Sequence, residues 1–268
     1  MLDAISITSV CDIILFLIGL FVLNKFLVKE NNLGFTIRNS SYPLAYAIAI
    51  SGSFLTPSIS FGVEYILFSA VDVVLVISLL LLSMKINSSI ILHKLDNDLL
   101  IKDGNLSIPI IESGLMIATS IILFSSMYGE GKYTDGLIFF ILGQSSLFGM
   151  VLVYEKFSKF DDFALIKQNN ISVALIIVAM VIGFSSFIGV NIFGDSSPHG
   201  LAEDIFAFLY FFAFGVVFLI VFINKFLDKV FFPYQEIEDE IEKDNFFVVI
   251  PYAIMKLSLI FIIAIALH

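Results

Sequence analysis

Long apolar stretches recur along the whole chain, and they constrain its fold more than any other feature. A helix needs about 20 such residues to cross the ~30 Å hydrocarbon core of a bilayer. Stretches such as Val73–Leu82 show no alternation of apolar and polar residues, which argues against a membrane β-barrel. Because 59% of the 268 residues are hydrophobic and 14% are charged, a soluble fold would leave much apolar surface in water. The sequence therefore predicts an all-α integral membrane protein.

Eight segments are predicted to be transmembrane helices. They are Ile5–Asn24, Tyr42–Ser60, Gly62–Met84, Leu106–Ser126, Thr134–Val153, Ile171–Phe193, Ile205–Ile223 and Phe246–Leu267. The longest polar link, residues 228–245, is too short to fold alone, so residues 1–268 are expected to form a single transmembrane domain. Because no basic segment precedes the first apolar run, that run is interpreted as a first span rather than a cleaved signal peptide.

The basic residues predict how these spans are oriented. Twelve of the fourteen lysine and arginine residues fall in the odd-numbered links, whereas Lys132 falls in an even-numbered link and Lys256 within the last span. Cytoplasmic loops of membrane proteins carry such an excess of basic residues, and acidic residues contribute little to the rule. The odd-numbered links are therefore predicted to face the cytoplasm of a bacterial inner membrane, with both termini outside.

The links also predict an internal repeat. The pattern Ile-x-x-x-Asn precedes three spans and ends at Asn105, Asn170 and Asn245, while Ile37–Ser41 has the same pattern with serine last. A short polar side chain at a helix start can accept a hydrogen bond from the first turn, so Ser41, Asn105, Asn170 and Asn245 are predicted helix caps. An even number of spans per unit keeps successive units in parallel orientation. The predicted two-span units are about 1–60, 61–130, 131–200 and 201–268.

With these motifs the chain resembles the YjfL-type family of small bacterial inner-membrane proteins, which is domain-of-unknown-function family 350. The residues that carry the resemblance are Ile101, Asn105, Ser107 and Gly114, then Ile166, Asn170, Ser172, Ala174 and Gly183, and finally Ile241 and Asn245. The resemblance implies two-span units in tandem over nearly the whole chain, and it implies no established activity. The first and fourth units depart from the family pattern at Ser41 and at Phe246–Phe247.

Polar residues within the spans are the candidates for chemistry. The sequence has no nucleophile motif, phosphate-binding glycine loop or Cys/His metal spacing, so no enzymatic activity, cofactor or metal is expected. Ionisable groups within spans are costly and usually face the protein interior, which singles out Asp12, Glu112 and Lys256, together with the polar Gln144. These side chains line a polar path or proton relay in one interpretation. In another, Lys256 forms a buried ion pair with Glu112, the favoured partner, or with Asp12.

Two hypotheses about function follow. The leading one is transport or conduction of an ion or small polar solute through a polar seam between the repeats. The rival is a non-conducting membrane scaffold or sensor that binds a cytoplasmic protein through the acidic 228–245 link, which is otherwise a solvated amphipathic segment. The lipid bilayer is an expected partner in both cases and nucleic acid is not, while a homo-oligomer is left open.

Overall fold

A computed structural model describes residues 2–55, 63–128, 133–158, 161–192, 200–218, 223–232 and 237–266, and over these residues the chain is helical without a strand. The long helices are α1 (Leu2–Leu23), α2 (Leu33–Leu55), α3 (Val63–Ile91), α5 (Ser107–Met127), α6 (Tyr133–Phe157), α8 (Ile171–Ile192), α9 (Leu201–Phe218) and α12 (Phe246–Ala266). The short helices are η1 (Asn24–Phe26), α4 (Asn97–Lys102), α7 (Asp162–Lys167), α10 (Asn224–Val230) and α11 (Ile237–Glu242).

Within the described residues, six helices are long and apolar enough to cross a membrane, namely α1, α3, α5, α6, α8 and α12. The chain is therefore a multi-pass helical membrane protein. Two other predicted spans fall on α2 and α9, which run alongside these helices but are not among the six. The predicted span ends Ser60, Gly62, Phe193 and Leu267 lie outside the described residues.

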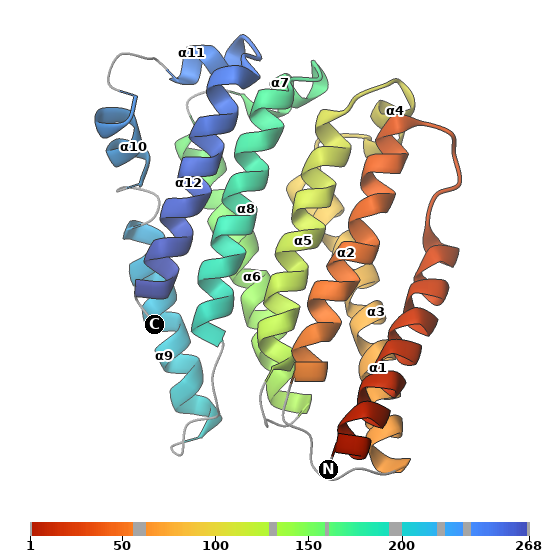
Figure 1. Ribbon diagram of the computed structural model, residues 1–268. Coiled ribbons are helices and arrows are strands. Elements are labelled where there is room, and N and C mark those ends of the chain that lie inside the picture. Colours follow the sequence, from red (N-terminus) through yellow and green to blue (C-terminus); the bar gives the residue numbers. More distant parts are fainter. Residues whose placement is uncertain are drawn as a thin grey trace.

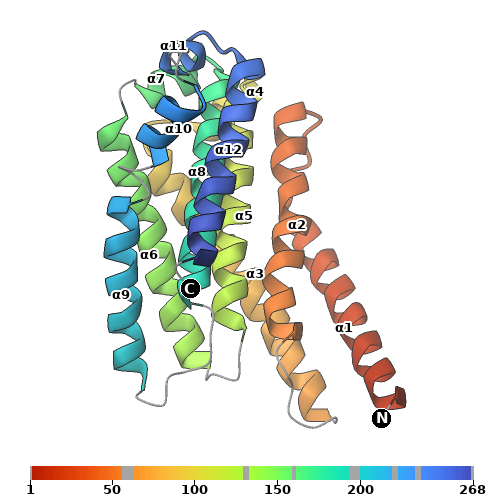
Figure 2. The same ribbon diagram turned by 60° about the vertical axis from the view of Figure 1, so that its left-hand side comes forward.

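The long helices form two layers (Figures 1 and 2). One row consists of α2, α5, α8 and α12 in contact with one another in that order, and the other consists of α1, α3, α6 and α9. Helices α5 and α8 are the most enclosed, with 72% and 78% of their spans buried. Glycine permits close packing along this row, because a methyl group at Gly114 would lie 2.6 Å from a methyl of Val178, and one at Gly183 would lie 2.7 Å from Ile260.

Helix α2 begins at Leu33 rather than at Tyr42, which corrects the prediction for this span. Ser41 consequently lies inside the helix, where its hydroxyl donates to the carbonyl oxygen of Arg38 at 2.7 Å. The prediction that Ser41 caps a helix was therefore wrong. The residue before α2 is Asn32, and its side-chain oxygen accepts a hydrogen bond from the N–H of Gly34 at 2.7 Å. The polar stretch at 36–41 is typical of a link, but part of it faces the interior of the bundle.

The short helices α4, α7 and α11 lie at the end of the bundle opposite to the N-terminus (Figure 1). Each buries an isoleucine near its own end, and these are Ile101, Ile166 and Ile241. The side chains of Asp96 and Asp161 cap α4 and α7 by accepting hydrogen bonds from backbone N–H groups at 3.3 and 3.1 Å. The predicted links are therefore partly helical, with one apolar side facing the bundle.

The same asparagine contact recurs three times along the row of inner helices. The side-chain amides donate from Asn32 to the carbonyl of Ile101 at 3.1 Å, from Asn105 to Ile166 at 2.7 Å and from Asn170 to Ile241 at 2.7 Å. Each bond joins the start of a long helix of this row to the short helix that directly precedes the next helix of the row. The side-chain oxygens of Asn105 and Asn170 also accept backbone N–H groups three residues ahead, at 3.1 and 2.8 Å, and so cap α5 and α8.

The residue before a capping asparagine forms a second hydrogen bond between neighbouring helices of the row, in which its side-chain oxygen accepts a backbone N–H. Asn169 accepts a hydrogen bond from the N–H of Leu106 at 2.6 Å, and Asp244 accepts one from the N–H of Ser172 at 2.7 Å. Both residues have a positive φ, 64° and 55°, as does Gly104 (91°) at the corresponding place before α5. Asn245, the last of the predicted caps, donates from its amide to the carboxylate of Glu240.

The orientation of the bundle can be tested by cysteine labelling in a Cys11→Ala background. Single cysteines at the exposed positions Asp103 and Glu242 should be shielded from a membrane-impermeant thiol reagent added to intact cells, because both lie at the lysine-rich end. Cysteines at Gly131 and Ser197 should react. Labelling at Asp103 or Glu242 before permeabilisation would contradict the predicted orientation.

The asparagine contacts predict a stability difference between Asn170, which caps α8, and Asn191, which lies within α8. Asn170→Ala should lower the free energy of unfolding in detergent by roughly 1–3 kcal/mol, because a buried carbonyl and a helix start lose their partners. Asn191→Ala is the matched control, since the Asn191 amide bonds to the carbonyl of Phe187 within the same helix. Unfolding of both variants is followed by circular dichroism or light scattering. Equal losses for the two variants would contradict a special role for Asn170.

Candidate functional site

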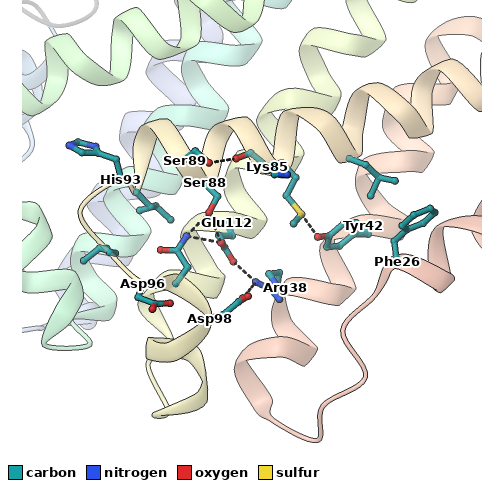
Figure 3. Close-up of a pocket in the computed structure, with 15 residues that line it drawn as sticks. Phe26, Arg38, Tyr42, Lys85, Ser88, Ser89, His93, Asp96, Asp98 and Glu112 are labelled. Carbon is teal, nitrogen blue, oxygen red and sulfur yellow. Dashed lines mark hydrogen bonds and ion pairs between the residues drawn. The ribbon is translucent and has the colours of Figure 1, made fainter.

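The most polar buried cluster surrounds Glu112, in the second turn of α5 (Figure 3). Arg38 of α2 places its Nη1 atom 3.4 Å from Glu112 Oε2 and 2.8 Å from Asp98 Oδ1 of α4. The side chains of Arg38 and Glu112 are 6% and 4% exposed, whereas that of Asp98 is 68% exposed. A single guanidinium thus bridges a buried carboxylate and a solvated one.

Neutral donors complete the surroundings of Glu112. The amide nitrogen of Asn97, at the start of α4, donates to Glu112 Oε1 at 2.9 Å and also to the hydroxyl of Ser88 at 2.7 Å. Ser88 of α3 lies 3.5 Å from the same carboxylate oxygen. Helices α2, α3 and α4 therefore all contribute polar groups to one carboxylate of α5. Such compensation is required for a carboxylate inside a membrane helix bundle.

This cluster forms one wall of a pocket of about 880 Å³ between α2, α3, α4 and α5. The charged residues that line it are Arg38, Lys85, Asp96, Asp98 and Glu112, and His93 lies at its edge. The remaining lining is mixed, with apolar side chains such as Leu81 and Leu92 beside polar ones such as Ser88. A cavity of this size is in the range that binds small solutes.

A second polar group lies deeper, between α3, α5 and α6. The amide nitrogen of Asn87 donates to the hydroxyl of Thr119 at 3.0 Å, and that hydroxyl lies 3.5 Å from the side-chain oxygen of Gln144. All three side chains are buried. Thr119 lies two turns beyond Glu112 along α5, about 10 Å at helical rise. Asn87 Oδ1 and Gln144 Nε2 are buried without a hydrogen-bond partner in the described part of the chain.

A third polar group lies towards the opposite end of α3. Asp72 accepts a hydrogen bond from the hydroxyl of Ser53 in α2, and Tyr133 at the start of α6 also hydrogen-bonds to it. Asp72 is about 22 Å from Asn87 at helical rise along α3. The polar side chains of α3 therefore lie at two levels, Asn87 next to Ser88 near one end and Asp72 towards the other.

The four predicted candidate residues lie in three different places. Glu112 and Gln144 belong to the polar groups along α5 and α6. Asp12 of α1 accepts a hydrogen bond from the hydroxyl of Tyr65 in α3 at 2.6 Å. Lys256 of α12 lies elsewhere again, with its Nζ 5.7 Å from the ring centre of Tyr154 and 5.8 Å from that of Tyr252.

The predicted pair between Lys256 and Glu112 was wrong, because the basic partner of Glu112 is Arg38. Helix α8 packs between α5 and α12 and separates the two side chains. Depth along the helix axis, from which the pairing was inferred, does not tell which helices are neighbours. The alternative pairing with Asp12 was also wrong, because Asp12 lies on α1, at the opposite side of the bundle from α12 (Figure 1). Its hydrogen-bond partner is Tyr65.

Arg38 was missed because it was assigned to a link. The sequence holds a signal that could have found it: Arg38 follows Asn32 by six residues, and Glu112 follows Asn105 by seven. Had Asn32 been recognised as the counterpart of Asn105, both charges would have been placed at a similar depth. Gly34 and the nearby Lys29 are typical of a link, so the helix start between them was not recognised.

Asp162, outside the spans at the start of α7, is the counterpart of Asn97. The pKa of its carboxyl is raised to about 6, chiefly by burial, and the nearby acids Glu155 and Asp161 act in the same direction. A hydrogen bond from Ser158 and the charge of Lys256 oppose these effects. Ionisation of Asp162 therefore occurs close to physiological pH.

Comparison with known proteins places the chain in a sequence family. A family model described as Domain of Unknown Function (DUF350) matches residues 2–127 and 130–267. No curated protein and no solved structure matches the chain.

The raised pKa of Asp162 predicts how stability changes with pH. The folded protein binds this proton more tightly than the unfolded chain, so its stability should fall as the pH rises from about 4 to about 6. Asp162→Asn removes that loss and should stabilise the protein at pH 7 by up to roughly 3 kcal/mol, with little effect near pH 4. Thermal unfolding at the two pH values tests this. Asp239→Asn, at an exposed position of α11, should change neither value.

Proposed function

We propose that this multi-pass protein, which belongs to the DUF350 family, carries an ion or small polar solute across the membrane. The description of the family names no activity. The proposed path is a polar seam along α3 and α5. It begins at the pocket beside Glu112, continues past Asn87, Thr119 and Gln144, and ends near Asp72.

The observation that carries this proposal is the succession of buried polar groups from Glu112 to Thr119 along α5 and on to Asp72 of α3. One buried polar cluster in a membrane helix bundle can serve packing alone, because interhelical hydrogen bonds hold helices together. Three clusters at successive depths, with a solute-sized pocket at one end, are more typical of a pathway. The partnerless atoms Asn87 Oδ1 and Gln144 Nε2 in the middle cluster support this interpretation, since buried polar atoms normally have partners.

The proposal includes a topology. The chain crosses a bacterial inner membrane eight times as four parallel two-span units, with α2 and α9 as the second and seventh spans. The recurring asparagine contacts at Asn32, Asn105 and Asn170 support this arrangement, as does the pairing of one helix from each layer. The lysine-rich links then face the cytoplasm, where the pocket opens.

The alternative function is a membrane scaffold or sensor that binds a cytoplasmic protein through the acidic 228–245 link. Within this link, α11 buries Ile237 and Ile241 against the bundle and leaves Asp239 and Glu242 exposed. An amphipathic helix arranged in this way offers an acidic surface to a basic partner. Residues 233–236 of the link lie outside the described residues.

Two neighbouring residues of α5 provide the test. In proteoliposomes, Thr119→Val should reduce ion flux by about tenfold or more, because it removes the hydroxyl that links Asn87 and Gln144 without changing the side-chain shape. Ser120→Ala is the matched control, since the Ser120 hydroxyl is satisfied by the carbonyl of Ile117 in its own helix. Flux is followed with fluorescent indicators for H⁺, Na⁺ and K⁺.

Wild-type flux no greater than that of protein-free liposomes would overturn the transport proposal. Equal effects of Thr119→Val and Ser120→Ala would argue against this particular path. Absence of flux together with capture of a cytoplasmic protein that requires Asp239 and Glu242 would favour the scaffold.

A further inference from the structure

We propose that Glu112 is the ion-binding group of the seam, that the ion is a monovalent cation, and that Arg38 is the counter-ion which it displaces. The inference rests on the proposed transport function and assigns its substrate class. In the exchange, the guanidinium of Arg38 leaves Glu112 and remains with Asp98, while the cation takes its place on the buried carboxylate.

The distances show that Arg38 is held more closely by Asp98 than by Glu112. The same Nη1 atom lies 2.8 Å from Asp98 and 3.4 Å from Glu112. Charge-assisted N–H···O bonds are normally about 2.7–2.9 Å long, so the contact with Glu112 is a loose one. Among the described residues, Oε2 of Glu112 has no other hydrogen bond, whereas Oε1 faces the donors of Asn97 and Ser88. Oε2 is therefore the oxygen on which a cation can replace Arg38.

The charges around the pocket favour a cation over an anion. Two carboxylates, Asp98 and Glu112, share one guanidinium. Adding Lys85 and Asp96 leaves the charged lining with one more negative than positive group when His93 is neutral. A cleft lined by an excess of one sign concentrates ions of the opposite sign.

An unpartnered oxygen next to Glu112 also points to a cation. Asn97 is 9% exposed, and its Oδ1 has no hydrogen-bond partner in the described part of the chain, although its Nδ2 donates to Glu112. Carbonyl and carboxylate oxygens are the usual ligands of hard cations. Arg38 Nε is likewise buried without a partner, so the guanidinium uses only part of its hydrogen-bonding capacity.

The number of acids limits the charge of the ion. No group of three or more His, Cys, Asp or Glu side chains that could hold a metal ion occurs among the described residues. A divalent cation that replaced Arg38 would leave an uncompensated positive charge beside a single buried carboxylate, which is costly in a membrane interior. A cation of single charge replaces the guanidinium one for one. The proton, Na⁺ and K⁺ share this chemistry.

The test measures cation binding to the purified protein in detergent, separately from flux. Na⁺ or K⁺ is titrated against choline chloride at constant ionic strength, and a pH titration in choline is the proton arm; the unfolding midpoint reports binding. In the wild type, one of these cations should raise the midpoint in a saturable way, and Glu112→Gln should abolish that rise. A purely structural Glu112 would lower the midpoint without removing its dependence on the cation.

Two further variants should change the affinity in opposite directions. Arg38→Gln removes the competitor and should lower the apparent Kd by about tenfold or more, because the site is no longer occupied by the guanidinium. Asp98→Asn removes the carboxylate that keeps Arg38 when it leaves Glu112 and should raise the apparent Kd. Lys102→Gln and Asp103→Asn are the matched controls, since they remove a positive and a negative charge at exposed positions at the end of α4 and should leave the Kd unchanged.

Each outcome separates this inference from the proposed function. Flux in the wild type with no Glu112-dependent cation binding would overturn the inference and leave transport standing. Glu112-dependent binding without flux would support the site and overturn transport. A tighter Kd in Asp98→Asn, or a weaker one in Arg38→Gln, would overturn the exchange.

Discussion

The backbone groups at the ends of short helices are the constraint on which this structure depends. The last carbonyls of a helix and its first N–H groups have no partner within the helix. At one end of this bundle both kinds of group come together, and an asparagine side chain serves both. Asn170 accepts the N–H of Val173 at the start of α8 and donates to the carbonyl of Ile241 near the end of α11. One side chain thus completes two helices and fixes the distance between them.

The same contact positions the candidate site. Asn32 holds the carbonyl of Ile101 in α4, and Asn97 lies four residues before Ile101 on the same buried side of that helix. Anchoring Ile101 therefore directs Asn97 towards Glu112, and it brings the adjacent Asp98 to Arg38. The polar cluster is consequently a product of the way in which the link is fastened to α2 and α5. A long helix alone could not bring these groups together.

Much of the bundle could be predicted from its apolar runs, because hydrocarbon permits few structures to cross it. The roles of Asn105 and Asn170 at helix starts could also be inferred, since capping depends on local sequence. Arg38 and the start of α2 could not, because the polar residues from 36 to 41 are typical of a link. The surroundings of Lys256 could not be predicted for another reason. Counting residues from a cap gives depth in the membrane, but it does not give the direction in which a side chain points or the helix that faces it.

The two halves of the chain contain a similar arrangement of charges in different surroundings. In each half, an acid of a short helix lies near a basic residue of an inner helix: Asp98 contacts Arg38, and the charge of Lys256 acts on Asp162. Arg38 and Lys256 are equally buried, but Arg38 lines a pocket, whereas Lys256 lies near the rings of Tyr154 and Tyr252. Aromatic rings can stabilise a buried ammonium group. The polar cluster of the first half borders the pocket, and this makes the pocket beside Glu112 the place to look for an activity.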